Sequence, residues 1–266
     1  VHDARGQPGQ MWVAAQLRSL HRGSQIVLSH QENDPRVQDP YSLRCMPQVL
    51  GAARDALGYV KQVVEAELGA VTDNPLVFPG DNAAIISAGN FHGMPLAIAL
   101  DMLAIALAHV AGIAERRVFW MLSAFDAEAH LRPYLSPNPG VSSGFMIAQY
   151  TAAACCNEVI GLCMPASVSN ISTSAGIEDY NSFGPRSAAK ARRALELTRL
   201  VVAIELLCAA EGIEYQRPLR SGDGVEAAHA AVRRVVPPLT QDRPLTADIE
   251  AIAGLIAARG LGASRP

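Results

Sequence analysis

Aromatic side chains are scarce in this sequence. They make up 5% of its 266 residues, whereas hydrophobic residues of all kinds make up 50%. A core with so few rings depends on Ala, Leu, Val and Ile, and these residues suit closely packed helices. The composition therefore favours an all-α bundle, and the length allows either one large domain or two small ones.

A concentration of positive charge is also missing. The formal net charge is -3, and no long run of Lys or Arg occurs. Proteins that bind a phosphate backbone need a basic surface. We therefore expect no nucleic acid partner.

Metal-binding spacings are absent as well. The five cysteines include no CxxC pair, and the seven histidines include no HExxH. Cys155 and Cys156 are consecutive residues in an apolar segment with helical spacing, so we interpret them as reduced, buried thiols. The sequence thus predicts no metal site and a cytoplasmic protein.

No apolar run continues long enough without polar interruption for a membrane span. The two longest, 95–124 and 144–163, contain Asp101, His109 and Glu158 among other polar residues. A span needs about 20 consecutive apolar residues. We therefore expect no membrane insertion and interpret both segments as central bundle helices, buried on most sides and in part across a subunit interface.

Helical spacing of apolar residues recurs along the rest of the chain. Segment 69–93 carries turn dipeptides and predicts a loop with at most a small hairpin. Segment 166–188, rich in Ser, Asn and Gly, interrupts apolar helices, as functional loops often do. The helices predicted by periodicity cover 9–23, 47–68, 95–124, 144–163 and 185–212, with weaker ones near 223–235 and 246–259.

The stretch 38–44 reads QDPYSLR and gathers functional side chains at one helix entrance. Because Pro40 restricts the residue before it to extended backbone, a helix can begin only after it. Tyr41 and Arg44 are three residues apart and share one side of the first turn. A helix entrance has unpaired backbone N–H groups, and a guanidinium can hold a carboxylate with two hydrogen bonds.

Each of these residues also has an ordinary structural interpretation. Arg44 can form a surface ion pair with Asp39, which contributes little to stability. Tyr41 can be a partly buried tyrosine with its hydroxyl hydrogen-bonded, and Gln38 a loop amide. The residue types alone leave these alternatives open.

Several motifs in order resemble one family. They are VHDARGQPGQ at the start, VQDPYSLRCMPQVLG at 37–51, ISAGNFHG at 86–93, GFMIAQYTAAA at 144–154 and ISTSAGIEDYNSFG at 171–184. Together they resemble the carboxy-terminal half of the histidine and aromatic amino acid ammonia-lyases, over most of the chain. The resemblance implies an all-α long-helix bundle, a cytoplasmic homotetramer whose active sites draw on several subunits, and an internal methylidene-imidazolone (MIO) electrophile.

The triplet that forms this electrophile is absent. In the family, MIO arises from Ala-Ser-Gly in the amino-terminal half, and this sequence contains no Ala-Ser-Gly. We therefore interpret residues 1–266 as the carboxy-terminal part of such an enzyme. The missing amino-terminal half is then an expected partner, and the chain alone is expected to be inactive.

The resemblance also assigns roles to individual residues. It implies that Arg44 binds the substrate carboxylate and Tyr41 positions the substrate and supports proton transfer. It further implies that Gln38 lines the same pocket, Phe91 packs against the imidazolone ring and Glu178 acts at the substrate ring. The structural alternatives are a core position for Phe91 and a helix cap for Glu178. His92 is expected to be a hydrogen-bonded structural histidine.

Glu178 bears on the substrate. An ionised carboxylate can accept an imidazole N–H, whereas a phenyl ring offers it nothing in return for desolvation. The flanking Ile177 and Tyr180 and the following NSFG depart from the histidine-enzyme pattern, and NSFG leans towards the phenylalanine type.

The family resemblance and Glu178 together favour elimination of ammonia from L-histidine, a small-molecule substrate, to give urocanate in histidine catabolism. The alternatives are a tyrosine or phenylalanine ammonia-lyase, a 2,3-aminomutase, or a non-catalytic helical scaffold. The fumarase and aspartase class is disfavoured because no GSSxMPxKxN loop occurs.

Overall fold

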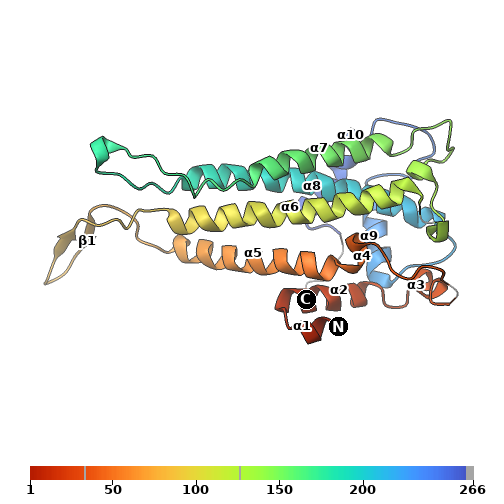
Figure 1. Ribbon diagram of the computed structural model, residues 1–266, viewed down its shortest axis with the longest axis horizontal. Helices are drawn as coiled ribbons and strands as arrows, with labels where there is room; N and C mark the ends of the chain where they lie inside the picture. Colours follow the sequence, from red (N-terminus) through yellow and green to blue (C-terminus); the bar gives the residue numbers. More distant parts are fainter. Residues whose placement is uncertain (33, 126, 262–266) are drawn as a thin grey trace.

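The protein is an elongated bundle of antiparallel helices (Figure 1). A computed structural model describes residues 1–32, 34–125 and 127–261. The four longest helices are α5 (Met46–Leu68), α6 (Met94–Ser123), α7 (Met146–Leu162) and α8 (Gly184–Tyr215). The shorter ones are α1 (His2–Arg5), α2 (Pro8–Leu20), α3 (Gln25–Ser29), α4 (Tyr41–Arg44), α9 (Asp223–Arg233) and α10 (Thr246–Ala257).

The helices predicted from periodicity are all present, with ends shifted by a few residues. The small hairpin is confirmed: β1 (Leu76–Phe78) pairs antiparallel with β2 (Ala84–Ile86), with Val77 opposite Ile85. Short 3-10 turns lie at Ala127–Ala129, Pro133–Leu135 and Ser174–Gly176. The fold is therefore all-α apart from this one hairpin in the described residues.

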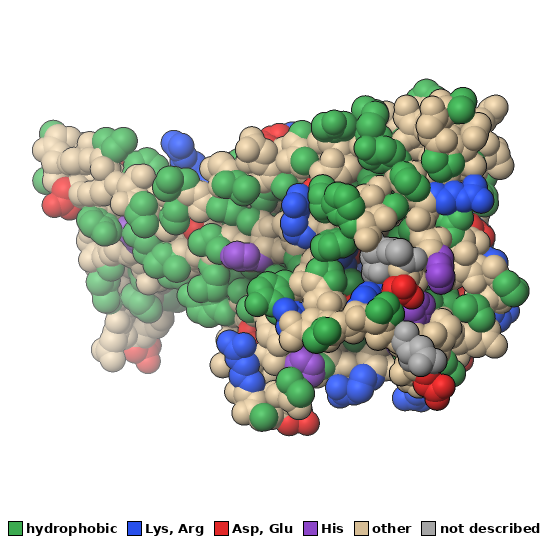
Figure 2. Space-filling view, turned by 45° about the vertical axis from the view of Figure 1, so that its right-hand side comes forward, with side chains coloured by type: hydrophobic (Ala, Val, Ile, Leu, Met, Phe, Trp, Pro, Cys, Tyr) green, Lys and Arg blue, Asp and Glu red, His purple; other side chains and the backbone are tan. Residues whose placement is uncertain are grey.

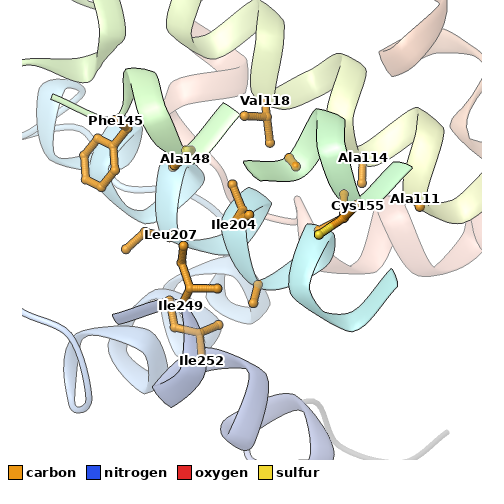
Figure 3. Packing of buried hydrophobic residues seen from close by; sticks show 14 of the residues in the cluster. Ala111, Ala114, Val118, Phe145, Ala148, Cys155, Ile204, Leu207, Ile249 and Ile252 are labelled. Atoms are coloured by element: carbon orange, nitrogen blue, oxygen red, sulfur yellow. The ribbon is translucent and has the colours of Figure 1, made fainter. Parts of the chain in front are cut away.

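Packing of α6 against α8 forms the centre of the bundle. Small side chains on α6, among them Ala104, Ala111 and Ala114, are fully buried, and so are Ile204 and Leu207 on α8 (Figure 3). Alanine has little volume, so two long helices can approach closely along many turns. The scarcity of aromatic residues in the sequence has its explanation here.

Close contact between α2 and α5 depends on two glycines. A Cβ atom at Gly51 would lie 2.4 Å from the backbone nitrogen of Gln10, and one at Gly9 would lie 2.2 Å from the Gly51 carbonyl oxygen. The backbone N–H of Gly9 also donates to Asp55 Oδ2 at 3.0 Å. Larger side chains at either position would force the two helices apart.

The helix α7 corrects one expectation from the sequence. Its buried residues are Ala148, Ala152, Cys155 and Val159, which form a single stripe, while Ile160 is 67% exposed. The prediction that it is buried on most sides is therefore wrong for a single copy of the chain. An apolar helix that is covered on one side only has surface left for another polypeptide.

Exposed hydrophobic side chains also follow α6. Ile98 and Ile105 are 46% and 41% exposed, and Figure 2 shows hydrophobic side chains spread over the long helices on the face it presents. By length and composition, α6 is the one helix in the described residues that could cross a membrane. The polar residues within it, such as Asp101 and His109, predict from the sequence that it does not. Asp101 and Glu115 on α6 are buried, and the helix packs at the centre of the bundle. A central bundle helix is as apolar as a membrane span, so its position in the bundle accounts for its composition.

The cysteines are unpaired, as predicted. Burial raises the pKa of Cys155, and burial next to Glu115 raises the pKa of Cys156 to about 11. A thiol with a raised pKa carries little thiolate at neutral pH. Cys155 is buried, as predicted, whereas Cys156 is only partly buried against the core, and neither thiol is suited to act as a nucleophile.

Leu207 is expected to contribute strongly to stability because its side chain is fully buried between helices. Leu207→Ala should lower the free energy of unfolding by about 2–5 kcal/mol, through lost burial and the cavity left behind. Urea unfolding followed by circular dichroism measures this loss. Leu195→Ala, on the same helix but 45% exposed, is the matched control, and an equal loss in both variants would contradict the packing described.

Glu226 should make stability depend on acid pH. The Arg217 guanidinium, at 2.9 and 3.0 Å, and the Ser221 backbone N–H, at 2.7 Å, hold the pKa of this carboxyl below its usual 4.5. A lowered folded-state pKa gives stability that is complete above the unfolded pKa and is lost as pH falls through the folded one. Glu226→Gln should therefore destabilise at pH 7 and differ less from the wild type below about pH 4.

The measurement is urea unfolding of both proteins between pH 7 and pH 3. Glu250→Gln, at an exposed position on α10, controls for the general effect of removing one carboxylate. A difference between Glu226→Gln and the wild type that stays the same at pH 3 and pH 7 would rule out this account.

Candidate functional site

The predicted pair Tyr41 and Arg44 lies together on α4. The guanidinium carbon of Arg44 is 4.4 Å from the centroid of the Tyr41 ring, and Tyr41 is 69% exposed. The Arg44 side chain therefore stacks on the Tyr41 ring. Arg44 and Asp39 both lie in the described part of the chain, and no ion pair joins them. Gln38 is exposed in the irregular stretch just before the helix. The shared face predicted from the spacing is confirmed, and the partly buried interpretation of Tyr41 is wrong for a single copy.

A buried arginine holds α4 in place. Arg117, on α6, donates from Nη1 to the Ser42 carbonyl oxygen at 3.2 Å and pairs with Glu205 on α8. Their side chains are only 12% and 19% exposed. Pro40 and Leu43 line an apolar cavity of about 250 Å³ beneath α4, and Tyr41 and Arg44 are not among its lining residues. The tyrosine and arginine are therefore presented on the outer side of an anchored turn.

Phe91 and Glu178 lie at the other end of the bundle. Phe91 precedes α6 and is 56% exposed, so it is not a core residue in a single copy. His92 Nε2 donates to the Tyr180 carbonyl oxygen at 3.0 Å, and the two rings stack with centroids 6.4 Å apart. The loop that carries Phe91 is thus joined to the loop that carries Glu178, and His92 has the structural role expected of it.

Glu178 is held within its own loop. Its backbone pairs with that of Thr173, and Thr173 Oγ1 donates to Glu178 Oε2 at 2.8 Å. The helix that follows, α8, has Phe183 as its N-cap residue and no side-chain cap. The alternative in which Glu178 caps this helix is therefore wrong.

Charged side chains anchor the start of the same loop. Asp101 is buried in α6 and accepts the Ser167 backbone N–H at 2.7 Å. Lys190, on α8, lies with Nζ 3.8 Å from Asp101 Oδ1 and donates to the Met164 carbonyl. Both helices thus fix the position of the loop that presents Glu178.

The two groups of predicted residues are far apart in one copy. Ser42, next to Tyr41, contacts Arg117 on α6, and Phe91 lies just before Met94, the first residue of α6. Met94 and Arg117 are 23 residues apart. At 1.5 Å per residue the separation along α6 is roughly 35 Å. In Figure 1, α4 and the hairpin lie towards opposite ends of α5. One chain alone therefore does not surround a small substrate with all five residues.

Sequence patterns did not single out Arg117, Thr173 or Lys190 as contributors. A charged residue inside an apolar helical run, such as Asp101, can indicate a buried ion pair that holds a neighbouring segment in place. Thr173 offered none, because its contact depends on how the loop turns. Within the described residues, no group of three or more His, Cys, Asp or Glu side chains is placed to hold a metal ion.

The fold and the order of these loops define a class of protein. Residues 1–234 match the family model of the aromatic amino acid lyases. The chain belongs to this family.

The similar proteins include histidine ammonia-lyases and a tyrosine aminomutase. The histidine ammonia-lyase of Anaeromyxobacter sp. (strain K) is 51% identical over 262 residues, covering 98% of this chain and 51% of that protein. The crystal structure of histidine ammonia-lyase from Trypanosoma cruzi is similar with a TM-score of 0.88 at 40% identity, covering 98% of this chain and 48% of that chain. Tyrosine aminomutase from Streptomyces globisporus gives a TM-score of 0.87 at 34% identity, with coverages of 98% and 52%. The chain spans about half the length of these relatives.

Arg117 should be required for the position of α4. Arg117→Ala removes the hydrogen bond to Ser42 and leaves the largely buried Glu205 carboxylate without its partner. We expect a loss of about 2 kcal/mol in the free energy of unfolding and faster amide exchange at Leu43 to Cys45. Arg192→Ala, which removes an 83%-exposed arginine on α8, is the control and should change neither quantity. Unchanged exchange in α4 of Arg117→Ala would refute the anchoring role.

Proposed function

We propose that the whole protein eliminates ammonia from L-histidine to give urocanate, and that this chain supplies part of the active site. The observation that carries the proposal is Glu178, an ionisable carboxylate held at the tip of an anchored loop. Such a carboxylate suits the imidazole ring, because it can accept a ring N–H. The similarity to histidine ammonia-lyases at about half of all positions supports the same substrate.

We assign roles to the chain's residues from the family resemblance, and the chemistry of the side chains is consistent with these roles. Arg44 holds the substrate carboxylate through its guanidinium fork, and Gln38 adds an amide beside it. Tyr41, whose ring stacks under Arg44, positions the substrate and serves in proton transfer. Glu178 binds the imidazole and assists at the ring.

The reaction balances without an external oxidant or reductant. A base takes the β-proton, the electrons of that C–H bond become the second carbon–carbon bond, and the α-carbon to nitrogen bond breaks. The amine leaves with the electrons of that bond and departs as ammonia. No redox change and no further co-reactant is needed.

The MIO group fits what this chain provides, although its source lies elsewhere. When present it supplies an electron-poor centre that makes the amine a leaving group. The chain has no Ala-Ser-Gly, so we assign the source to an amino-terminal half outside this sequence. Phe91, an exposed ring at a loop end, is suited to pack against a planar heterocycle and exclude water.

The site we propose is shared between copies of the protein. About 35 Å along α6 separates Tyr41 and Arg44 from Phe91 and Glu178, so the two groups serve one substrate only if they come from different copies. An apolar groove of about 370 Å³ between α5 and α6, lined by Ala52, Met102 and Ile105 among others, is left open in one copy. This open groove and the exposed side of α7 are apolar surfaces of the kind that oligomer interfaces cover, and we propose that the protein is a cytoplasmic homotetramer.

A tyrosine- or phenylalanine-directed lyase or aminomutase is the second candidate. Ile177, Tyr180 and NSFG depart from the histidine pattern, and a tyrosine aminomutase is among the similar structures. A mutase returns ammonia to the β-carbon and yields a β-amino acid, so product analysis distinguishes it. A non-catalytic scaffold would show no turnover at all.

The deciding experiment is an ultraviolet assay of the protein with its amino-terminal half restored. L-histidine, L-tyrosine and L-phenylalanine are incubated separately, since each lyase product is a conjugated acrylate. We expect absorbance to grow with histidine only. Glu178→Gln should lower kcat/KM by about 100-fold or more, since an amide cannot take part in proton transfer. The chain by itself should give no signal.

Glu65→Gln is the control, because it changes an exposed glutamate on α5 that is 59% accessible. Conversion of tyrosine or phenylalanine, with no conversion of histidine, would contradict the proposed histidine activity and support the second candidate. Silence with all three substrates would favour the scaffold.

A further inference from the structure

We propose that Thr173 is a positioning residue that orients the Glu178 carboxylate towards the substrate ring. This inference rests on the proposed function and extends it to a residue with no role assigned so far. The observation is the hydrogen bond from Thr173 Oγ1 to Glu178 Oε2 at 2.8 Å.

The hydrogen bond leaves one carboxylate oxygen available. Thr173 occupies Oε2, and within the described residues no hydrogen bond reaches Oε1. A free carboxylate rotates about its last bond and presents either oxygen. With Oε2 held by a hydroxyl, Oε1 is directed outward as the acceptor for a ring N–H.

The backbone of the loop brings these two side chains together. Thr173 has extended backbone, with φ -129° and ψ 179°, and the next three residues all have positive φ: Ser174 at 50°, Ala175 at 56° and Gly176 at 91°. Two of these three are not glycine, so the turn is strained. This turn brings the chain back on itself, so that Thr173 N donates to the Glu178 carbonyl oxygen at 2.9 Å. Backbone strain of this kind commonly accompanies functional sites.

Two asparagines brace the loop without help from the threonine hydroxyl. Asn170 Nδ2 donates to the Asp179 carbonyl at 2.7 Å, and the Asn181 backbone N–H donates to Asn170 Oδ1 at 2.8 Å. Asn181 Nδ2 donates to the Ile171 carbonyl at 2.6 Å and more weakly to that of Glu178 at 3.3 Å. Because the backbone has these separate supports, loss of the hydroxyl should free the carboxylate and leave the loop in place.

The test uses the full-length protein, with Thr173→Val to remove the hydroxyl and Thr173→Ser to retain it. Thr173→Val should raise the KM for L-histidine and the inhibition constant of urocanate by about tenfold each, while kcat changes less. Inhibition by cinnamate, whose ring has no N–H, should be unchanged. Thr173→Ser should restore the wild-type constants.

A double-mutant cycle separates positioning from general stability. In a Glu178→Ala background, Thr173→Val should have no further effect on urocanate inhibition, because the carboxylate that the threonine hydroxyl orients is gone. Amide exchange at Gly176 and Glu178 reports whether the loop persists. Where Thr173→Val opens the loop, Thr173→Ala provides the smaller truncation for the same assays.

Several results would overturn the proposal. They are wild-type constants in Thr173→Val, equal weakening of urocanate and cinnamate, independent effects in the double mutant, or loss of the loop in both truncations. Wild-type protein that fails to convert histidine would remove the proposed function and this inference with it. Normal wild-type turnover with an unaffected Thr173→Val variant would remove the inference alone.

Discussion

The close packing of α6 on α8 is the constraint on which the rest of the structure depends. Alanine-rich faces let two helices of 30 and 32 residues lie together along most of their length, with Ala104 and Ala111 fully buried. Because the pair is long and straight, its two ends are roughly 45 Å apart by the rise of an α-helix. Everything attached near one end is thereby held far from everything attached near the other.

This rigid separation explains how the site is organised. At one end, Arg117 and Glu205 bridge α6 and α8 and hold the turn that carries Tyr41 and Arg44. Near the other, Asp101 and Lys190 bridge the same two helices and hold the loop that carries Glu178. Each buried ion pair leaves an uncompensated charge if one partner is lost, so each fixes a geometry more than it adds stability. One scaffold thus holds a cation, Arg44, and an anion, Glu178, near opposite ends of its central helix pair.

Much of the fold could be predicted from local patterns. Helix-period spacing found the helices, and the turn residues around 74 and 80 indicated the hairpin. The short helix α3 went unpredicted, because five residues are too few to show a period. Burial of α7 was overestimated for a related reason: an all-round apolar helix looks the same in sequence whether its cover comes from its own chain or from another. Spacing on one turn correctly placed Tyr41 beside Arg44, because a single helical turn is local.

What the sequence determined by itself was therefore the set of local elements, the all-α class and the types of side chain available for chemistry, since each depends on residues a few positions apart. Tertiary structure alone decided that Tyr41 and Arg44 lie far from Phe91 and Glu178, that His92 joins two loops 88 residues apart, and that Thr173 meets the Glu178 carboxylate. These contacts depend on helix lengths, loop strain and packing acting together, and no short window of sequence contains that information.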